Sequence, residues 1–168
     1  MTARLLIVWH SRTGAARQMA HAMADGATKA ARAFEMPLDL VVRAALDASA
    51  EEVLSADGYL FCAPENLGAL SGEMKAFFDR RYYDALDRIG GRPYGLAISA
   101  GSDGQGACAQ ATRICTGWRL QKVAEPLVMR FAAQTPEAIL AEKTLNEEQR
   151  EACATLGGLL AATLLLAG

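Results

Sequence analysis

The sequence has few of the residues that build metal sites and disulfide frameworks. It contains only two histidines, His10 and His21, and their separation is not a metal-ligand spacing. None of its four cysteines forms a Cys-x-x-Cys pair, so the sequence predicts buried, reduced thiols in a cytoplasmic protein. We therefore expect neither a metal nor a disulfide framework. The cysteines are Cys62, Cys108, Cys115 and Cys153.

The sequence also lacks a strong charge of either sign and a long apolar run. Its formal net charge is −2, which gives no basic face and argues against nucleic acid as a partner. The apolar stretch at residues 5–9 is short and no cleavage region follows it, so we expect no signal peptide. The run at residues 156–167 is shorter than the roughly 20 residues of a membrane span, and it predicts a buried helix or an oligomer contact.

The length of 168 residues and a hydrophobic content of 52% predict a single domain over residues 1–168. Along it, apolar runs with strand character alternate with segments of helical spacing. We expect strands at residues 4–9, 38–43, 58–63 and 94–99, and a fifth within 123–131.

Five helices are expected between and after these strands. The first runs from Gly14 to about Phe34, and the second spans 47–56 with Asp47 or Ser49 as its cap. The fourth covers about 107–120, and the last follows a capping-box spacing between Asn146 and Gln149. The third ends before Gly90, and its expected inner face is Met74, Phe77, Phe78, Tyr82 and Leu86.

This alternation predicts an α/β fold: a doubly wound, five-stranded parallel sheet with helices on both faces. Ligands of such sheets bind at the carboxyl ends of the strands, where the strand order reverses. Three loops at those ends differ from ordinary connections: 10–15, 64–71 and 100–106. With the strand order 2-1-3-4-5, they converge on one crevice.

The loop "HSRTGA" (10–15) has two interpretations. Ser11 and Thr13 offer hydroxyl groups, Gly14 permits a tight turn, and the following helix directs free N–H groups at the loop. Such a helix start binds anions readily. The same residues are also common helix caps. Taken by itself, the loop favours neither a phosphate site nor a plain cap.

Two motifs resemble a known family. "SRTGAA" (11–16) resembles the phosphate loop of flavodoxins. "APENLGALSGEMKAFFDR" (63–80) resembles the second loop and following helix of NAD(P)H-dependent FMN and quinone reductases of the flavodoxin-like superfamily. The residues matching that helix motif are Met74, Lys75, Phe77, Asp79 and Arg80. The glycine-rich stretch at 99–107 stands where the family's last flavin-contacting loop lies.

The resemblance implies FMN as the cofactor and NAD(P)H as its reductant. It implies that the phosphate is surrounded by Ser11, Arg12, Thr13, Gly14, Ala15 and Ala16. One side of the isoalloxazine ring would be lined by Pro64, Glu65, Asn66, Leu67 and Gly68. Its other edge would be approached by Gly101, Ser102, Asp103 and Gly104. No residue is assigned a catalytic role, because the cofactor carries the chemistry.

The sequence departs from the family pattern in two places. Ala16 stands where the phosphate loop usually ends in threonine, and the second loop lacks the tryptophan or tyrosine that often stacks on the flavin. A ring open on one face suits hydride acceptance from a nicotinamide and delivery to a quinone. Tyr83 and Trp118 are interpreted as surface or core aromatics rather than ring contacts.

Two further features receive a structural interpretation. "GQGACA" (104–109) fits the G-x-G-x-x-A dinucleotide pattern, with Glu125 21 residues after Gly104, but it begins too far beyond its strand. A flavin-ring loop explains these residues better. His10 adjoins the phosphate loop, and a structural role is favoured over a catalytic one.

The leading hypothesis is an FMN-dependent oxidoreductase that passes hydride from NAD(P)H to a quinone or another small acceptor. One alternative is a flavodoxin-type electron carrier between protein partners. Another is a non-catalytic regulatory or scaffold protein, which the loss of a hydroxyl at Ala16 keeps open. We expect a cytoplasmic homo-oligomer.

Overall fold

The computed structural model describes residues 1–167, and its centre is a parallel sheet. Five strands give the order β2-β1-β3-β5-β7, because β7 pairs with β5 from Ala97↔Leu127 onward. Two short strands complete the sheet: β4, antiparallel to β3, and β6, parallel to β5. The fourth and fifth predicted strands correspond to β5 and β7, so the predicted order 2-1-3-4-5 is confirmed. The strands are β1 (Ala3–Trp9), β2 (Leu38–Ala44), β3 (Gly58–Asn66), β4 (Ala69–Leu70), β5 (Pro93–Ala100), β6 (Gln121–Lys122) and β7 (Leu127–Arg130).

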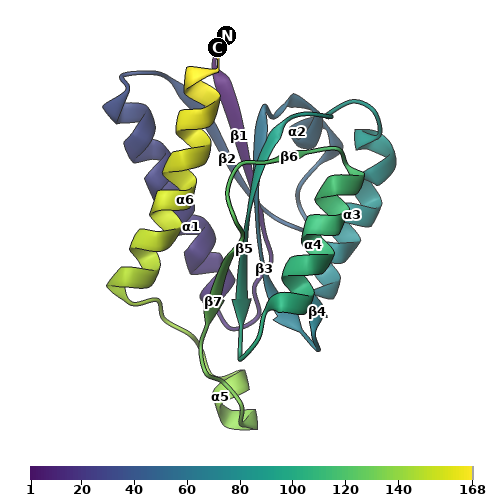
Figure 1. Cartoon of the computed structure of the whole chain (residues 1–168), viewed down its shortest axis with the longest axis vertical. Coiled ribbons are helices and arrows are strands. Elements are labelled where there is room, and N and C mark those ends of the chain that lie inside the picture. The colour runs from purple at the N-terminus through teal and green to yellow at the C-terminus, as the bar shows by residue number, and fades with distance from the viewer. Residues whose placement is uncertain (168) are drawn as a thin grey trace.

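Helices cover both faces of the sheet (Figure 1). One layer holds α1 (Ala15–Ala33) and α6 (Glu147–Leu166). The other holds α2 (Ala50–Ser55), α3 (Gly72–Ala85) and α4 (Gln105–Gly117). The short α5 (Pro136–Leu140) protrudes beyond the sheet at the lower end of the view.

Strand β1 shows why this sequence needs two layers. Leu5 and Ile7 pack in the cluster under α1 and α6, whereas Leu6 and Val8 pack in the cluster under α3 and α4. All four side chains are fully buried. A strand covered on both faces is a continuous apolar run in the sequence, as residues 4–9 are.

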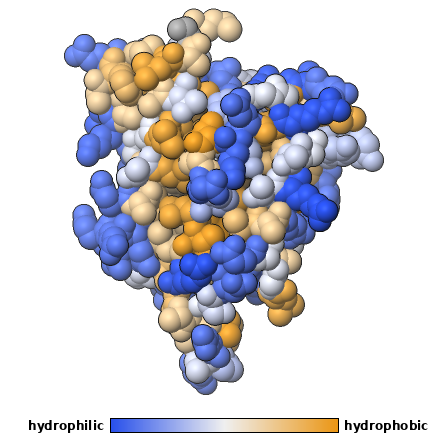
Figure 2. All heavy atoms as spheres, in the orientation of Figure 1, coloured by the Kyte–Doolittle hydropathy of each residue, from blue (hydrophilic) through white to orange (hydrophobic). Residues whose placement is uncertain are grey.

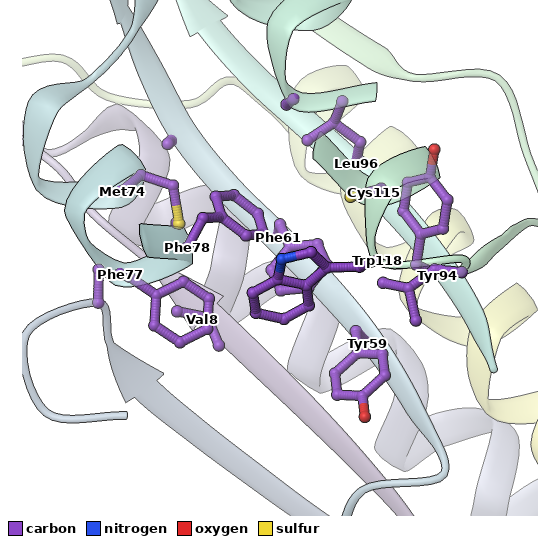
Figure 3. Close-up of a cluster of buried hydrophobic side chains, with 14 of the residues drawn as sticks. Val8, Tyr59, Phe61, Met74, Phe77, Phe78, Tyr94, Leu96, Cys115 and Trp118 are labelled. Atoms are coloured by element: carbon purple, nitrogen blue, oxygen red, sulfur yellow. The ribbon is translucent and has the colours of Figure 1, made fainter. Parts of the chain in front are cut away.

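The layer of α3 and α4 rests on an aromatic cluster (Figure 3). Phe61 from β3 meets the ring of Phe78 at 4.9 Å between centroids, and Phe78 meets Trp118 edge-on at 5.2 Å. Edge-to-face pairs of this kind add to the stabilisation that burial provides. Of the two aromatics interpreted as surface or core residues, Trp118 is therefore in the core and Tyr83 lies on the surface.

The predicted inner face of the third helix is wrong at its far end. Met74, Phe77 and Phe78 are buried, but the side chains of Tyr82 and Leu86 are 38% and 41% exposed. Helix α3 ends at Ala85, so Leu86 follows the helix rather than belonging to it. The apolar spacing continued beyond the part of the helix that the sheet covers.

The structure refines the predicted helix caps and the predicted loop after β3, and it adds one helix. Ser49, not Asp47, caps α2, and the box between Asn146 and Gln149 is confirmed at α6. The predicted loop 64–71 is largely a hairpin, since β3 continues to Asn66 and returns as β4. Helix α5 was not predicted.

All four cysteines are free thiols. Cys62, Cys115 and Cys153 are buried, as expected, and burial raises the pKa of each of these thiols. Cys108 is partly exposed, which corrects the expectation for that residue.

The apolar C-terminal run forms most of α6, and its inner side packs against α1. Leu156, Leu160, Leu164 and Leu165 are also buried, with Leu156 and Leu160 beside Gly95 of β5 and Leu164 beside Gly58 of β3. The expectation of a buried helix is confirmed. No helix within residues 1–167 combines the length and apolar character needed to cross a membrane.

Helices α1 and α6 approach each other closely at glycines. A Cβ atom at Gly157 would lie 1.9 Å from the carbonyl oxygen of Met23, and one at Gly26 equally close to that of Ala154. Backbone atoms cannot give way as a flexible side chain can. The contact therefore requires glycine on both helices.

We expect Gly157→Ala to lower the free energy of unfolding by about 2 kcal/mol, because the added methyl group forces the helices apart. The neighbouring Gly158→Ala is the matched control, since its Cβ would meet nothing closer than 3.4 Å. Alanine favours the helix there, so the control should be neutral or stabilising. Urea unfolding of both variants measures the difference, and equal midpoints would contradict this account of the packing.

Candidate functional site: the carboxyl edge of the sheet

Three loops meet at the carboxyl edge of the sheet, the lower end in Figure 1. Residues 10–14 follow β1, and residues 101–104 follow β5. Between them lies the hairpin that the end of β3 forms with β4. Because β1, β3 and β5 are neighbours in the sheet, the loops are neighbours too. The convergence predicted from the sequence is thus present.

The first loop turns tightly into α1. Gly14 has φ 93°, in the left-handed region that glycine tolerates, and its N–H donates to Ser11 Oγ at 3.2 Å. Arg12 is exposed beside it. Ala15 and Ala16 form the first turn of α1 with buried side chains, so they can offer only backbone N–H groups to a ligand. The Ala16 side chain packs in the core. Position 16, where the family usually has a threonine, therefore directs its side chain into the core.

The N-terminus of α1 differs from every other helix start within residues 1–167. It has no side-chain cap hydrogen bond and no acidic residue in its first turn. The other helices have a side-chain cap, a first-turn acid or, at α4, the carboxylate of Glu65. Unpaired N–H groups and the helix dipole favour an anion at such a position. The residues present therefore fit the phosphate of FMN.

The second loop is a rigid hairpin. Leu67 and Gly68 form its two-residue turn with φ values of 52° and 74°, the pattern of a type I′ turn. Gln110 on α4 accepts a hydrogen bond from Leu70 N–H at 2.7 Å. A Cβ at Gly106 would lie 1.8 Å from the carbonyl oxygen of Gly68, so the turn rests directly on the first turn of α4.

Glu65 links the second loop to the third. Its carboxylate accepts hydrogen bonds from Gly104 N–H at 2.9 Å and from Ala107 N–H at 3.1 Å. The side chain thus caps α4, which has no cap of its own. The sequence placed Glu65 among the residues lining the flavin ring, and the structure gives its carboxylate this positioning contact.

The third loop is held from its other side. Ala133 N–H donates to the Gly101 carbonyl at 2.9 Å, and Arg130 Nε donates to the Asp103 carbonyl at 2.9 Å. Gly104 has φ 84° and precedes α4. Ser102 and Asp103 remain exposed at the edge. The glycine-rich stretch therefore presents exposed polar residues between two fixed points.

His10 joins the first loop to the start of α3. Its Nδ1 lies 2.9 Å from the Oγ of buried Ser71, and its Nε2 lies 3.6 Å from Glu73 Oε2. Burial lowers the pKa of His10; Glu73 opposes this shift and Arg12 adds to it. The ring is thus engaged in a contact between elements.

Two residues that the sequence patterns did not indicate, Gln18 and Lys143, also take part in this edge. The Gln18 amide donates to the carbonyls of Gly14 and Lys143 at 3.1 and 2.6 Å, and it accepts from Leu145 N–H. Lys143 N–H donates to the Thr13 carbonyl at 2.8 Å. These contacts fasten the segment after α5 to the first loop. No local pattern marks such long-range partners, although Thr135 and Pro136 are a helix-start signal for α5.

Comparison with known proteins identifies the family. The model of the NADPH-dependent FMN reductase family matches residues 10–134, which include all three loops. The chain belongs to this family. A flavodoxin of Aquifex aeolicus (strain VF5) is 31% identical over 163 residues, covering 94% of this chain and 85% of that protein. The chain is accordingly an FMN-binding flavoprotein of the oxidoreductase or electron-carrier type.

Solved structures show the same fold. A flavodoxin from the domain Archaea superposes with a TM-score of 0.76 at 15% identity, covering 96% of this chain and 98% of that one. An oxidoreductase from Corynebacterium diphtheriae superposes with a TM-score of 0.73 at 21% identity, covering 99% and 98%. The flavodoxin-like fold expected from the sequence is thereby confirmed.

Proposed function

We propose that this protein oxidises NAD(P)H and passes the electrons through FMN to a quinone or another small acceptor. The proposal rests on the hairpin of β3 and β4, which we call the ring-side hairpin because its residues 64–68 are proposed to line the flavin ring. This hairpin is fixed in place on α4 and has no aromatic side chain between Pro64 and Leu70. A flavin without a stacked aromatic on that side stays open to hydride donors and acceptors. Bound FMN supplies the redox chemistry, so that NAD(P)H, a proton and a quinone give NAD(P)⁺ and the hydroquinone.

In this proposal the chain binds and orients the cofactor. The uncapped start of α1 holds the phosphate through backbone N–H groups, with Arg12 adding positive charge. The hairpin and the third loop hold the ring from two sides and are locked to each other by Glu65. The proposed cofactor residues are Ser11, Arg12, Thr13, Gly14, Ala15, Ala16, Pro64, Glu65, Asn66, Leu67, Gly68, Gly101, Ser102, Asp103 and Gly104.

A second function is favoured by one observation, the 31% identity to a protein named flavodoxin. An electron carrier exchanges electrons with protein partners and turns over no substrate of its own. The net charge of −2 supports this alternative less well, because carriers often dock through a marked acidic face.

Anaerobic mixing of the FMN-loaded protein with NADPH or NADH separates the two functions. For the oxidoreductase we expect the absorbance of oxidised flavin to disappear without any partner protein, and a quinone to restore it through repeated cycles. A flavin that stays oxidised under excess of both nucleotides contradicts the proposal and favours the carrier.

The remaining features of the proposal concern the setting of the protein. Four free cysteines support a reducing, cytoplasmic location. We propose one flavodoxin-like domain over residues 1–168 that assembles as a homo-oligomer. Light scattering of the purified protein tests the oligomer.

A further inference from the structure

The segment 131–145, which we call the strap, joins two of the three loops of the candidate site. At its beginning, Ala133 N–H donates to the Gly101 carbonyl at 2.9 Å. Near its other end, Lys143 N–H donates to the Thr13 carbonyl at 2.8 Å. The strap therefore runs from the third loop to the first loop.

Between these two ends the strap has little contact with the rest of the protein. Helix α5 has no buried residue, and it projects from the carboxyl edge of the sheet (Figure 1). Figure 2 shows the same projection at the lower end of the molecule, with hydrophobic and hydrophilic atoms side by side. Within the described residues 1–167, no hydrogen bond or ion pair joins residues 134–142 to a residue outside the strap. The attachment of the strap therefore depends on its ends.

The Gln18 amide holds the end that lies on the first loop. Its Nε2 donates to the Lys143 carbonyl at 2.6 Å and to the Gly14 carbonyl at 3.1 Å. Its Oε1 accepts from Leu145 N–H at 3.1 Å, and the Leu145 side chain is buried. Both donor hydrogens and the acceptor oxygen of the amide are thus engaged. An apolar side chain of the same length could make none of these bonds.

These contacts fix the directions of the backbone groups in the first loop. A trans peptide unit is planar, so its N–H and C=O groups point in opposite directions. The Thr13 carbonyl faces the strap, and the Gly14 carbonyl faces Gln18. The N–H groups of Gly14 and Ala15 therefore point the other way, into the loop, where the Gly14 N–H meets Ser11 Oγ.

The conformational freedom of Gly14 makes this hold important. Glycine adopts left-handed and right-handed backbone conformations with similar ease, and Gly14 has φ 93°. Without the strap, the peptide units on either side of Gly14 could turn over and present carbonyl oxygens to the loop. A carbonyl oxygen repels an anion, whereas an N–H group at a helix start binds one. The strap thus selects the orientation that suits a phosphate.

We infer that Gln18 is a positioning residue for phosphate binding, because it fastens the strap to the first loop and keeps the N–H groups of Gly14 and Ala15 directed at the anion. The inference rests on the proposed placement of the FMN phosphate at the start of α1. Gln18 acts through the backbone of the loop and makes no contact with the phosphate. A cofactor that contacts both the first and the third loop stabilises both ends of the strap, so cofactor binding and strap attachment favour each other.

The test removes the Gln18 amide in two ways. Gln18→Met keeps the length of the side chain, and Gln18→Ala leaves room for water at the freed backbone groups, which keeps that variant folded. The matched control is Tyr59→Phe, which removes a buried hydrogen bond of 2.6 Å to the Val53 carbonyl. Tyr59 lies at the amino end of β3, away from the loops of the candidate site.

Two measurements are made on each apoprotein. Titration with FMN and with riboflavin gives the ratio of the two affinities, which a general loss of stability does not change because both ligands carry the same ring. Hydrogen exchange of residues 141–146 reports on the attachment of the strap. In both Gln18 variants we expect the preference for FMN to fall about tenfold and exchange at Lys143 and Leu145 to accelerate about tenfold or more. Tyr59→Phe should change neither quantity.

An unchanged preference for FMN in the Gln18 variants contradicts the inference, even where the FMN affinity itself falls. Strap exchange no faster than in the unmodified protein contradicts it as well. An equal loss of preference in Tyr59→Phe would assign the effect to general destabilisation. Equal binding of FMN and riboflavin by the unmodified protein overturns the phosphate placement, and the inference with it. Neither measurement uses NAD(P)H or an acceptor, so a failure of the proposed electron transfer leaves this test intact.

Discussion

Ser11→Asp is expected to weaken FMN binding by about 100-fold or more while making the apoprotein more stable. The Ser11 hydroxyl already accepts the Gly14 N–H at the start of α1. A carboxylate there caps a helix start that has neither a cap nor an acid, which is worth about 0.5–1 kcal/mol. It also repels the phosphate at short range by about 3–4 kcal/mol.

The opposite signs of the two effects make this variant informative. Isothermal titration with FMN and thermal unfolding of the apoprotein measure them separately. Ser11→Asn is the matched control, because asparagine has the size of aspartate and an oxygen that can cap the helix but carries no charge. Equal losses of affinity in both variants would show that the phosphate lies elsewhere.

Gly106→Ala is expected to lower the free energy of unfolding by about 2–3 kcal/mol and to weaken FMN binding by about tenfold. The new Cβ would lie 1.8 Å from the Gly68 carbonyl oxygen, so the hairpin must move away from α4. That movement also breaks the hydrogen bonds of Glu65 to the start of α4. Stability and cofactor binding should therefore fall together.

The control lies at the other end of the same helix. A Cβ at Gly117 meets nothing within 4 Å, so Gly117→Ala should leave both quantities unchanged or raise the stability slightly. Urea unfolding and FMN titration measure both variants. An unperturbed FMN affinity in Gly106→Ala would mean that the hairpin is not part of the cofactor site.

The order and burial of the main elements could be predicted from the sequence because the central strands β1, β3 and β5 are buried on both faces. Such strands are continuous apolar runs, and alternation with helical spacing then fixes a parallel sheet. The capping box at Asn146 was also readable, since its residues are local.

Elements that depend on distant partners were harder to predict. Pro64 and Gly68 suggested a loop, yet β3 extends through Pro64, and the turn at Leu67 lacks the usual asparagine signal. Tyr82 and Leu86 continued a helical pattern past the area that the sheet covers.

In the candidate site, too, local motifs could be predicted from the sequence and contacts between distant residues could not. Its motifs predict a phosphate role for residues 11–16 and a ring contact for residues 64–68, and both roles stay predictions. The contacts that lock them together, Glu65 to α4 and Gln18 to Lys143, span 39 to 42 and 125 positions, and no local pattern encodes such partners.

The central claim is that the start of α1 holds the phosphate of FMN. Titrating the apoprotein in parallel with FMN and with riboflavin, which carries the same ring without the phosphate, tests it most directly. We predict that FMN binds about 100-fold more tightly at moderate salt and that Ser11→Asp removes most of this difference. Equal affinities for FMN and riboflavin in the unmodified protein would contradict the account.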